Sequence, residues 1–299
     1  MDNIENKKVT AVIVTYNRKE LLKECIEALL NQDYKNCNVL VIDNNSSDGT
    51  HEFISEYIDG EKVIYENTGE NLGGAGGFNY GIKKAYELGC DYIWIMDDDC
   101  IVHKDSLTEF LNADKSLDGE YGFLSSKVLW KDDNICKMNV QRKTVFRTVK
   151  DFETNLVPIA MASFVSLFVK ASIVKEMGLP IKEFFIWTDD WEYTRRISLK
   201  YKCYLVNKSV VTHKSKNNSG ADIVNDTPDR IGRYKYVYRN DVYLYCREGF
   251  KGWMYIFCRN MYHYMRIICS KNKDKKDRIN VIKKATKDGK TFDPKIEMV

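Results

Sequence analysis

The segment Val9–Thr15, near the start of the chain, is almost entirely apolar and rich in β-branched residues. Such a composition is typical of a strand that is buried on both faces of a parallel sheet. Apolar residues then recur at helical spacing from Leu21 to Leu30, after Asn17 and Glu20, which have the spacing of a capping box. The sequence therefore predicts a strand, a tight turn and a helix in direct succession.

The same alternation continues through the first third of the chain. Strands are predicted at Val39–Ile42, Lys62–Glu66 and Tyr92–Met96, and a helix is predicted at Gly76–Leu88. Strands that alternate with helices are typical of an α/β fold with a doubly wound, mostly parallel sheet. Ligands of such sheets bind beyond the carboxyl ends of the strands, so we expect the functional site there.

Polar residues stand at three of these predicted strand ends: Thr15 with Asn17, then Asp43, then the triplet Asp97–Asp99. In an extended chain the side chains alternate, so Asp97 and Asp99 are expected to point to the same side. Two carboxylates that face one way repel each other unless a cation lies between them, and Mg²⁺ or Mn²⁺ suits such oxygen ligands. The triplet thus predicts a divalent metal site, and the alternative is a solvated acidic turn.

A glycine-rich block, Asn71–Phe78, is predicted to open a helix. Free backbone N–H groups at a helix start can face an anion such as a phosphate. A dinucleotide-binding fingerprint is excluded by spacing, because its third glycine would fall at Asn79 and the block is not in the first strand-to-helix turn. The remaining alternative is that the glycines only allow a helix to pack closely on the sheet.

The segment Thr188–Glu192 is predicted to begin another helix, where acidic residues are favoured whatever the protein does. The functional interpretation is that a carboxylate of Asp189 or Asp190, kept ionised by the N–H groups, removes a proton from an attacking hydroxyl. Nearby aromatic residues are suited to a platform for a sugar ring: Phe184, Phe185, Trp187 and Trp191.

His213 follows the apolar stretch from Tyr204 to Val211. On spacing alone, a single histidine at a strand end is most often a structural, hydrogen-bonded residue. The other histidines show no partner pattern and are interpreted as surface residues: His51, His103 and His263.

Composition excludes several classes of protein. The first ten residues are polar, so they do not resemble a secretory signal, and no apolar run is long enough to span a bilayer. The nine cysteines are scattered without C-x-x-C spacing, which argues against zinc, redox and disulfide sites. No nucleic-acid-binding motif is present. We therefore expect a cytoplasmic protein with reduced thiols.

The C-terminal segment differs from the rest of the chain. Residues 250–299 carry 13 Lys and Arg against 5 Asp and Glu, and Gly252–Cys258 is rich in aromatic residues. An amphipathic helix with a basic flank is attracted to anionic lipid, while the alternative is a core helix with a solvated tail. We divide the chain into a nucleotide-sugar-binding and catalytic domain, 1–229, and a helical, aromatic-basic segment, 230–299.

Five motifs together resemble family 2 glycosyltransferases, over about residues 9–240. They are Thr15-Tyr16-Asn17-Arg18, Asp43-Asn44-Asn45-Ser46, the block Asn71–Phe78, Asp97-Asp98-Asp99 and Asp189-Asp190-Trp191-Glu192. The glycine-rich block with its phenylalanine is most similar to the bacterial galactofuranosyltransferase branch, and rhamnosyltransferases are the nearest rivals.

The resemblance implies a GT-A fold and an inverting, metal-dependent transfer of a hexose from a nucleotide diphosphate. It implies that the donor is held by Thr15, Asn17, Arg18, Asp43, Asn71, Gly74, Asp97 and Asp98, and the metal, Mn²⁺ or Mg²⁺, by Asp97, Asp99 and His213. It further implies that Asp190 is the catalytic base and that the acceptor is bound by Asp189, Trp187, Trp191, Glu192 and Arg239.

The expected donor is UDP-galactofuranose, and the expected acceptor is a hydroxyl of a glycan or lipid-linked glycan in cell-surface polysaccharide synthesis. One alternative is a rhamnosyltransferase that uses dTDP-rhamnose. Others are a sugar-nucleotide-binding assembly partner without turnover and a nucleotidyltransferase that releases pyrophosphate. The C-terminal segment is expected to contact the inner face of the cell membrane. The sequence does not indicate the oligomeric state.

Overall fold

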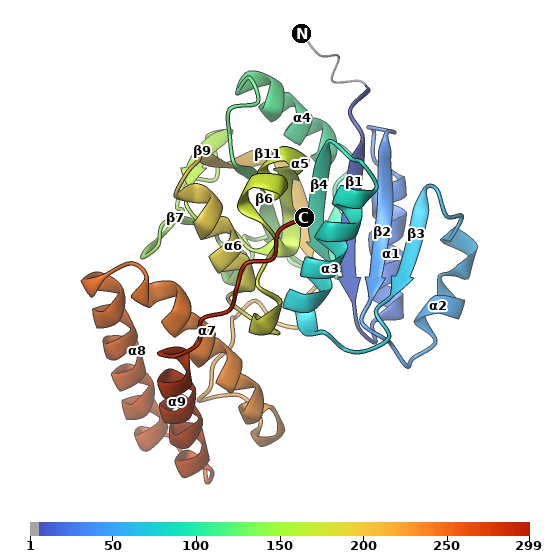
Figure 1. Ribbon diagram of the computed structural model, residues 1–299. Coiled ribbons are helices and arrows are strands. Elements are labelled where there is room, and N and C mark those ends of the chain that lie inside the picture. Colours follow the sequence, from blue (N-terminus) through green and yellow to red (C-terminus); the bar gives the residue numbers. More distant parts are fainter. Residues whose placement is uncertain (1–5) are drawn as a thin grey trace.

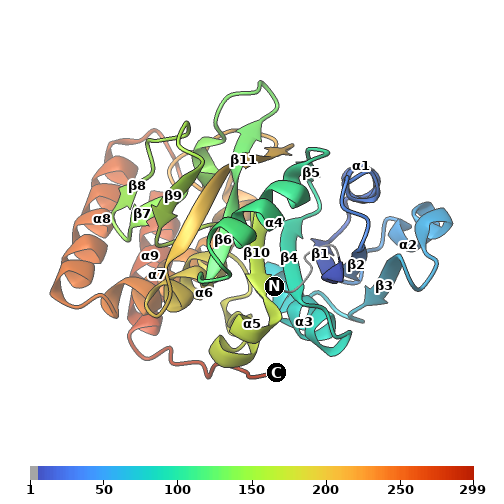
Figure 2. The same ribbon diagram turned by 90° about the horizontal axis from the view of Figure 1, so that it is seen from above.

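A single mixed sheet forms the centre of the protein in the computed structural model, which describes residues 6–299 (Figures 1 and 2). Its strand order is β3-β2-β1-β4-β10-β6-β11-β5, and β9 pairs with β11. The strands are β1 Val9–Thr15, β2 Cys37–Asp43, β3 Val63–Asn67, β4 Tyr92–Asp97, β5 Cys100–Val102, β6 Phe123–Trp130, β9 Leu156–Ile159, β10 Leu167–Lys170 and β11 Cys203–His213. A short hairpin, β7 Arg142–Thr144 and β8 Arg147–Thr148, stands apart from this sheet.

The first half of the sheet has the predicted parallel order. β1 runs parallel to β2 and β4, and β2 runs parallel to β3. Beyond β4 the sheet becomes mixed, because β10 is antiparallel to both of its neighbours and β11 is antiparallel to β5 and β9. The doubly wound α/β architecture is confirmed, while the sheet is parallel only in part.

Helices cover both faces of the sheet (Figure 1). One core cluster joins β1 to α1 and α4 through Leu22, Ile26 and Phe110, and the other joins β1 to α3 and α5 through Phe78 and Val174. These helices are α1 Lys19–Leu30, α2 Thr50–Phe53, α3 Gly73–Glu87, α4 Ser106–Ser116, α5 Ala171–Met177 and α6 Asp189–Ser198. Since successive residues of β1 enter opposite clusters, the apolar run Val9–Thr15 is buried on both faces as predicted.

The turn after β1 differs from the predicted capping box. α1 begins at Lys19, and the side chain of its N-cap residue, Arg18, makes no hydrogen bond to the first turn. Asn17 has a left-handed backbone, with φ 54°, and its Oδ1 accepts the N–H of Ser47 at 2.7 Å. The capping-box prediction is therefore wrong, because the Asn17 side chain ties the β1 turn to the β2 turn instead.

Three helices follow the sheet and form a bundle at one end of the molecule (Figure 1). They are α7 Tyr234–Cys246, α8 Phe250–Cys269 and α9 Lys275–Gly289, and they share a core that includes Tyr234, Ile267 and Ile282. The boundary predicted at 229/230 falls within a 3₁₀ turn, Pro228–Arg233, that leads into α7. Among the described residues, no helix has the length and apolar character needed to cross a bilayer.

The last residues return to the sheet domain. Phe292 packs against Phe184 and Tyr243, and the carbonyl oxygen of Glu297 accepts the N–H of Leu179 at 2.8 Å. The carboxylate of Glu297 pairs with Lys83 and Lys182. This return fixes the helical bundle against the domain that carries the predicted site.

Candidate active site

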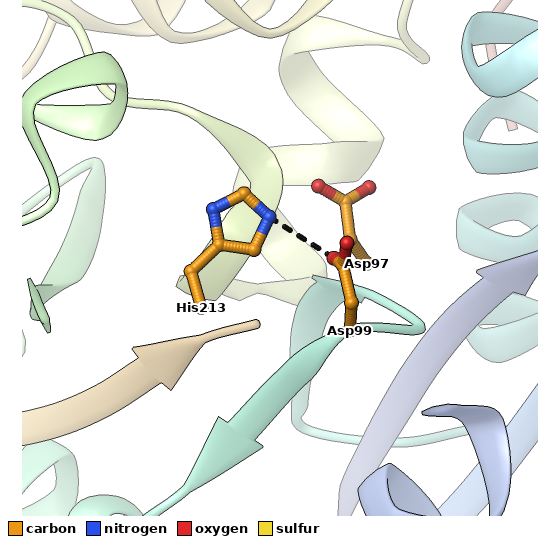
Figure 3. Close-up of side chains that lie close together, drawn as sticks. All are labelled: Asp97, Asp99 and His213. Carbon is orange, nitrogen blue, oxygen red and sulfur yellow. Dashed lines mark ion pairs between the residues drawn. The ribbon is translucent and has the colours of Figure 1, made fainter. Parts of the chain in front are cut away.

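Asp97, Asp99 and His213 come together at the edge of the sheet where β4 and β11 end (Figure 3). One ligand atom of each residue lies within 4.8 Å of the others. The pairing of β11 with β5 brings these residues together, because His213 pairs with Cys100, the residue next to Asp99. The Nε2 atom of His213 is 3.0 Å from Oδ1 of Asp99. Two strands far apart in the sequence thus build one cluster.

Asp97 and Asp99 lie close together because of a turn, and not because side chains alternate along a strand as predicted. β4 ends at Asp97, and Asp98 and Asp99 form a turn before β5. The turn directs Asp98 elsewhere, where its Oδ2 accepts the hydroxyl of Thr15 at 2.8 Å and its Oδ1 accepts Arg18 at 3.0 Å. Arg18 also bonds Asp99 at 2.8 Å. Arg18 therefore offsets part of the negative charge of the triplet.

Electrostatics within the cluster show how strongly its charges interact. Burial and the neighbouring Asp99 raise the pKa of Asp97 to about 7, against a partial lowering by His213. Burial lowers the pKa of His213, but contacts with Asp99 and Cys136 and the charge of Asp97 raise it to about 10. A proton on His213 therefore balances the acidic pair, and a divalent cation bound there would replace that proton.

The donor set fits a divalent ion. Oδ1 of Asp99 is buried, and within the described part of the chain it has no hydrogen-bond donor of good geometry, although His213 lies close by. The protonated imidazole of His213 is the cation that this buried carboxylate faces, and a divalent ion bound here would take its place. Two carboxylates and one imidazole suit a borderline-hard ion such as Mn²⁺, with further positions left for phosphate and water.

The predicted base lies at the start of α6, close to this cluster. Oδ1 of Asp190 accepts the N–H of Trp191 at 2.7 Å. Burial, followed by the charges of Asp189 and Asp97, raises the pKa of Asp190 well above its ordinary value and outweighs the opposing N–H of Trp191, so the N–H groups do not keep this carboxylate ionised as expected. Burial likewise raises the pKa of Asp189 to about 6. Because the charge of Asp97 contributes to this shift, the acidic helix start lies within electrostatic reach of the cluster of Asp97, Asp99 and His213.

Residues predicted to hold the nucleotide lie along the same edge of the sheet. Asp43 ends β2, where its Oδ1 accepts the N–H of Ser46 at 2.8 Å and its Oδ2 accepts the hydroxyl of Tyr65 at 2.6 Å. Oδ1 of Asn71 accepts the N–H of Gly73 at 2.9 Å. These bonds hold the orientation of Asp43, and each carboxylate oxygen retains a lone pair for a further donor.

The glycine-rich block forms the first turns of α3 and packs tightly. A Cβ at Gly73, which has φ 73°, would lie 2.2 Å from the carbonyl oxygen of Phe185, and one at Gly77 would lie 2.5 Å from Val14. Gly74 has open space where its Cβ would stand. Close packing thus explains Gly73 and Gly77, and Gly74 leaves room for a ligand near the helix start.

Two predicted acceptor residues each carry a guanidinium over the indole ring. Arg233 lies 5.5 Å from the ring centroid of Trp187, and Arg142 lies 4.9 Å from that of Trp191. Cations prefer this position over an indole face. The two tryptophans therefore present aromatic surfaces with positive charge beside the base.

Two further predicted acceptor residues, Glu192 and Arg239, are engaged within the fold. Glu192 pairs with Arg196 at 2.9 Å, and Arg196 also bonds the carbonyl oxygen of Leu179. Nη2 of Arg239 donates to the carbonyl oxygen of Glu183 at 2.6 Å. Both side chains hold neighbouring backbone in place in this structure.

Sequence reasoning missed a residue that orients His213. Oδ1 of Asn139 lies 2.8 Å from Nδ1 of His213, and Nδ2 of Asn139 donates to Ser163 at 3.0 Å. Asn139 lies in a short 3₁₀ turn, Lys137–Asn139, without any recognisable motif around it. No pattern in the sequence could have identified it, since only the fold brings it to the histidine.

The fold and the clustered acidic residues are those of a GT-A type protein, and comparisons with known proteins identify it as a glycosyltransferase. Residues 10–123 match the family described as Glycosyl transferase family 2. The chain is 26% identical over 285 residues to galactofuranosyltransferase GlfT1 of Mycolicibacterium smegmatis, covering 84% of this chain and 90% of that protein. It is 25% identical over 209 residues to the poly-beta-1,6-N-acetyl-D-glucosamine synthase of Staphylococcus aureus, covering 69% of this chain and 47% of that protein.

Solved structures support the same fold. TarS of S. aureus (residues 1–349) in complex with UDP superimposes with a TM-score of 0.56 at 14% identity, covering 95% of this chain and 72% of that one. GalNAc-T7 with UDP, GalNAc and Mn²⁺ gives a TM-score of 0.58 at 14% identity, covering 80% and 50%. Residues 10–123 thus match a family 2 glycosyltransferase domain, and the protein is a glycosyltransferase of GT-A fold.

Proposed function

We propose that the protein is an inverting glycosyltransferase in which Asp190 takes the proton of the acceptor hydroxyl. The observation that carries this proposal is the position of Asp190 at the start of α6, within electrostatic reach of the cluster of Asp97, Asp99 and His213. The oxygen freed of its proton attacks the anomeric carbon on the face opposite the leaving nucleoside diphosphate. A single displacement inverts that carbon, and no residue forms a covalent intermediate.

Asp97, Asp99 and His213 are proposed to hold Mn²⁺ or Mg²⁺. When bound, such an ion supplies positive charge that stabilises the departing diphosphate. Arg18 contributes further positive charge at the same place, since it already contacts Asp98 and Asp99. The raised pKa of Asp190 makes it a stronger base once it is ionised, which suits proton abstraction from a sugar hydroxyl.

The proposed donor is UDP-galactofuranose. Support comes from the similarity to GlfT1, named as a galactofuranosyltransferase, and from the glycine-rich block at Asn71–Phe78. Asp43 stands where its carboxylate can accept the imide N–H of uracil, a group that thymine also carries. The sugar is therefore selected elsewhere, and dTDP-rhamnose is the competing donor.

The proposed setting is the cytoplasmic face of a membrane, where the acceptor is a glycan or lipid-linked glycan. α8 supports this setting, because large apolar side chains are exposed along its whole length. They are Phe250, Trp253, Met254, Phe257, Met261, Tyr262, Met265 and Ile268. A helix with such a face and basic neighbours lies well in a bilayer interface.

A donor panel tests the proposed reaction. UDP-galactofuranose, UDP-galactopyranose and dTDP-rhamnose are each mixed with a synthetic glycoside acceptor, and released nucleoside diphosphate is measured. Release with UDP-galactofuranose and none with the other two supports the proposal. Efficient turnover of dTDP-rhamnose with none of UDP-galactofuranose overturns the donor assignment, release of pyrophosphate indicates nucleotidyl transfer, and binding without any release indicates a non-catalytic partner.

A further inference from the structure

The backbone immediately before α6 adopts an unusual conformation. Phe185, Trp187 and Thr188 have φ values of 64°, 66° and 72°, in the left-handed region that residues with a side chain seldom occupy. Thr188 is β-branched and Trp187 is bulky, which makes this conformation less favourable still. Such a segment keeps its shape only where surrounding contacts hold it. Because Asp189 and Asp190 follow directly, those contacts also determine where the base stands.

Asn240 of α7 supplies one set of these contacts. Its side chain is fully buried. Its Nδ2 lies within donating distance of three successive parts of the segment, the carbonyl oxygens of Phe184 at 3.0 Å, Ile186 at 3.2 Å and Trp187 at 2.9 Å. Its Oδ1 accepts Nε of Arg239 at 3.0 Å, which fixes the orientation of the amide. The side-chain amide of Asn240 therefore holds three carbonyl groups of the segment Phe184–Thr188 in place.

Asp241, the next residue of α7, holds the end of the segment. The hydroxyl of Thr188 donates to Oδ1 of Asp241 at 2.7 Å, and Oδ2 of Asp241 forms an ion pair with Arg259 of α8. Thr188 occupies the N-cap position of α6, yet its side chain makes no bond to the first turn. The N–H of Trp191 is consequently left to the carboxylate of Asp190.

We infer that Asn240 and Asp241 are positioning residues that hold Asp190 in place through the segment Phe184–Thr188. This inference rests on the proposed role of Asp190 as the base. It assigns a catalytic purpose to the helical bundle, because α7 carries both contacts and α8 carries the arginine that orients Asp241. The bundle is thus part of the catalytic apparatus, although it supplies no group that reacts.

The test compares Asn240→Ala and Thr188→Val with matched controls. Asn260→Ala is the control for the first variant, because Asn260 is also buried in the bundle and bonds Thr286 and, at 3.3 Å, Nη2 of Arg259, but does not bond the segment. Thr188→Ser is the control for the second, since serine keeps the hydroxyl that Asp241 accepts. Donor KM, kcat, Mn²⁺ affinity and melting temperature are measured for each protein.

Asn240→Ala and Thr188→Val are expected to lower kcat at least about tenfold, while donor KM and Mn²⁺ affinity stay within about twofold. This pattern is expected because each variant loses an interaction that is needed only for the chemical step. Asn260→Ala is expected to lose melting temperature without this fall in kcat, and Thr188→Ser to recover most of the rate. Equal kcat in Thr188→Val and Thr188→Ser overturns the inference, and so does a fall in kcat for Asn260→Ala as large as for Asn240→Ala. If Asn240→Ala does not fold, the threonine pair alone decides.

Asp190→Asn, measured alongside, separates this inference from the proposed function. An inactive Asp190→Asn together with fully active Asn240→Ala and Thr188→Val leaves the base in place and rejects the positioning role. An active Asp190→Asn rejects the base itself, and with it the purpose assigned to Asn240 and Asp241.

Discussion

Oδ1 of Asn139 lies 2.8 Å from Nδ1 of His213, on the side of the imidazole ring opposite the atom that faces Asp99. A carboxamide oxygen only accepts hydrogen bonds, so Nδ1 carries a proton in this contact. For a neutral ring, this leaves the lone pair on Nε2, directed at the acidic pair. Asn139 therefore sets both the tautomer and the orientation that a metal-binding histidine needs.

Asn139→Ala is accordingly expected to weaken Mn²⁺ binding by about 10- to 100-fold, the usual effect of removing such an outer partner. Calorimetric titration with Mn²⁺ measures this change. Ser163→Ala is the control, because it removes the partner of Nδ2 and leaves the bond to His213. Unchanged Mn²⁺ affinity in Asn139→Ala would show that His213 keeps its orientation without Asn139.

Asp190→Asn preserves the size of the side chain and its ability to accept the N–H of Trp191, but removes its ability to take a proton. We expect transfer to fall by about 10²–10⁴, the typical contribution of a general base. Nucleotide and metal binding, followed by calorimetry, are expected to match those of the unaltered protein. Near-normal turnover of Asp190→Asn beside an inactive Asp189→Asn or Glu192→Gln would move the base along the motif.

Metal removal tests the cluster as a whole. Exhaustive treatment with EDTA is expected to abolish transfer, because Asp97, Asp99 and His213 lose the ion for which their donor atoms are suited. Activity is expected to return on addition of Mn²⁺ or Mg²⁺, measured as release of nucleoside diphosphate. Full activity in a preparation shown by elemental analysis to be free of metal would refute metal dependence.

Local sequence patterns predicted the first half of the fold and the meeting of the polar strand ends at one edge of the sheet. Buried strands such as Val9–Thr15 can be recognised in the sequence by their apolar composition. In a parallel sheet the carboxyl ends of the strands lie at the same edge, so the polar residues at those ends meet there. The antiparallel arrangement of β10 was not predictable, because it depends on how β4 and β6 pair around it. Pairing between strands distant in sequence leaves no periodicity to detect.

The contacts that complete the site were beyond sequence reasoning for the same reason. Asn139 and Asp241 lie in segments without motifs, and each acquires its role only through a partner far along the chain. His263 was interpreted as a surface residue, yet it lies half-buried against α7 and that interpretation is wrong. A side chain's partners follow from tertiary packing, which local spacing does not encode.

His263 of α8 is held in its neutral form. The hydroxyl of Tyr238 lies 2.5 Å from its Nδ1. Burial, Arg259 and Arg266 lower the pKa of His263 to about 4, although two carboxylates oppose the shift. Those carboxylates belong to Asp222 and Asp241. The folded protein therefore favours the neutral form of His263.

This lowered pKa makes stability depend on pH in a defined direction. Between about pH 6.5, the ordinary value for histidine, and about pH 4, the unfolded chain binds a proton that the folded chain excludes. Stability therefore falls as pH falls through this window and is regained as pH rises.

His263→Gln keeps a hydrogen-bond acceptor but does not titrate. From pH 7 to pH 5 we expect the unaltered protein to lose roughly 1 kcal/mol more stability than this variant, measured by urea unfolding. Parallel losses in both proteins would contradict the prediction.

The exposed face of α8 allows a sharp test of membrane contact. Removing residues 270–299 is unsuitable, because Arg278 and Ile282 are buried and Phe292 packs on the sheet domain, so truncation would disturb the fold. Phe257 and Ile268 are 61% and 60% exposed, and replacing both with serine is expected to leave the fold intact.

We expect Phe257→Ser/Ile268→Ser to lower flotation with vesicles rich in phosphatidylserine, because the apolar face of α8 anchors the protein while the basic residues around it attract the anionic surface. Leu199→Ser is the control, since Leu199 is 66% exposed but belongs to the sheet domain. Binding by the unaltered protein is expected to weaken as salt is raised, and to be weaker with neutral vesicles. If the double variant floats like Leu199→Ser, α8 does not contact the bilayer. If the double variant instead changes the oligomeric state seen by light scattering, the face is an interface between copies of this chain.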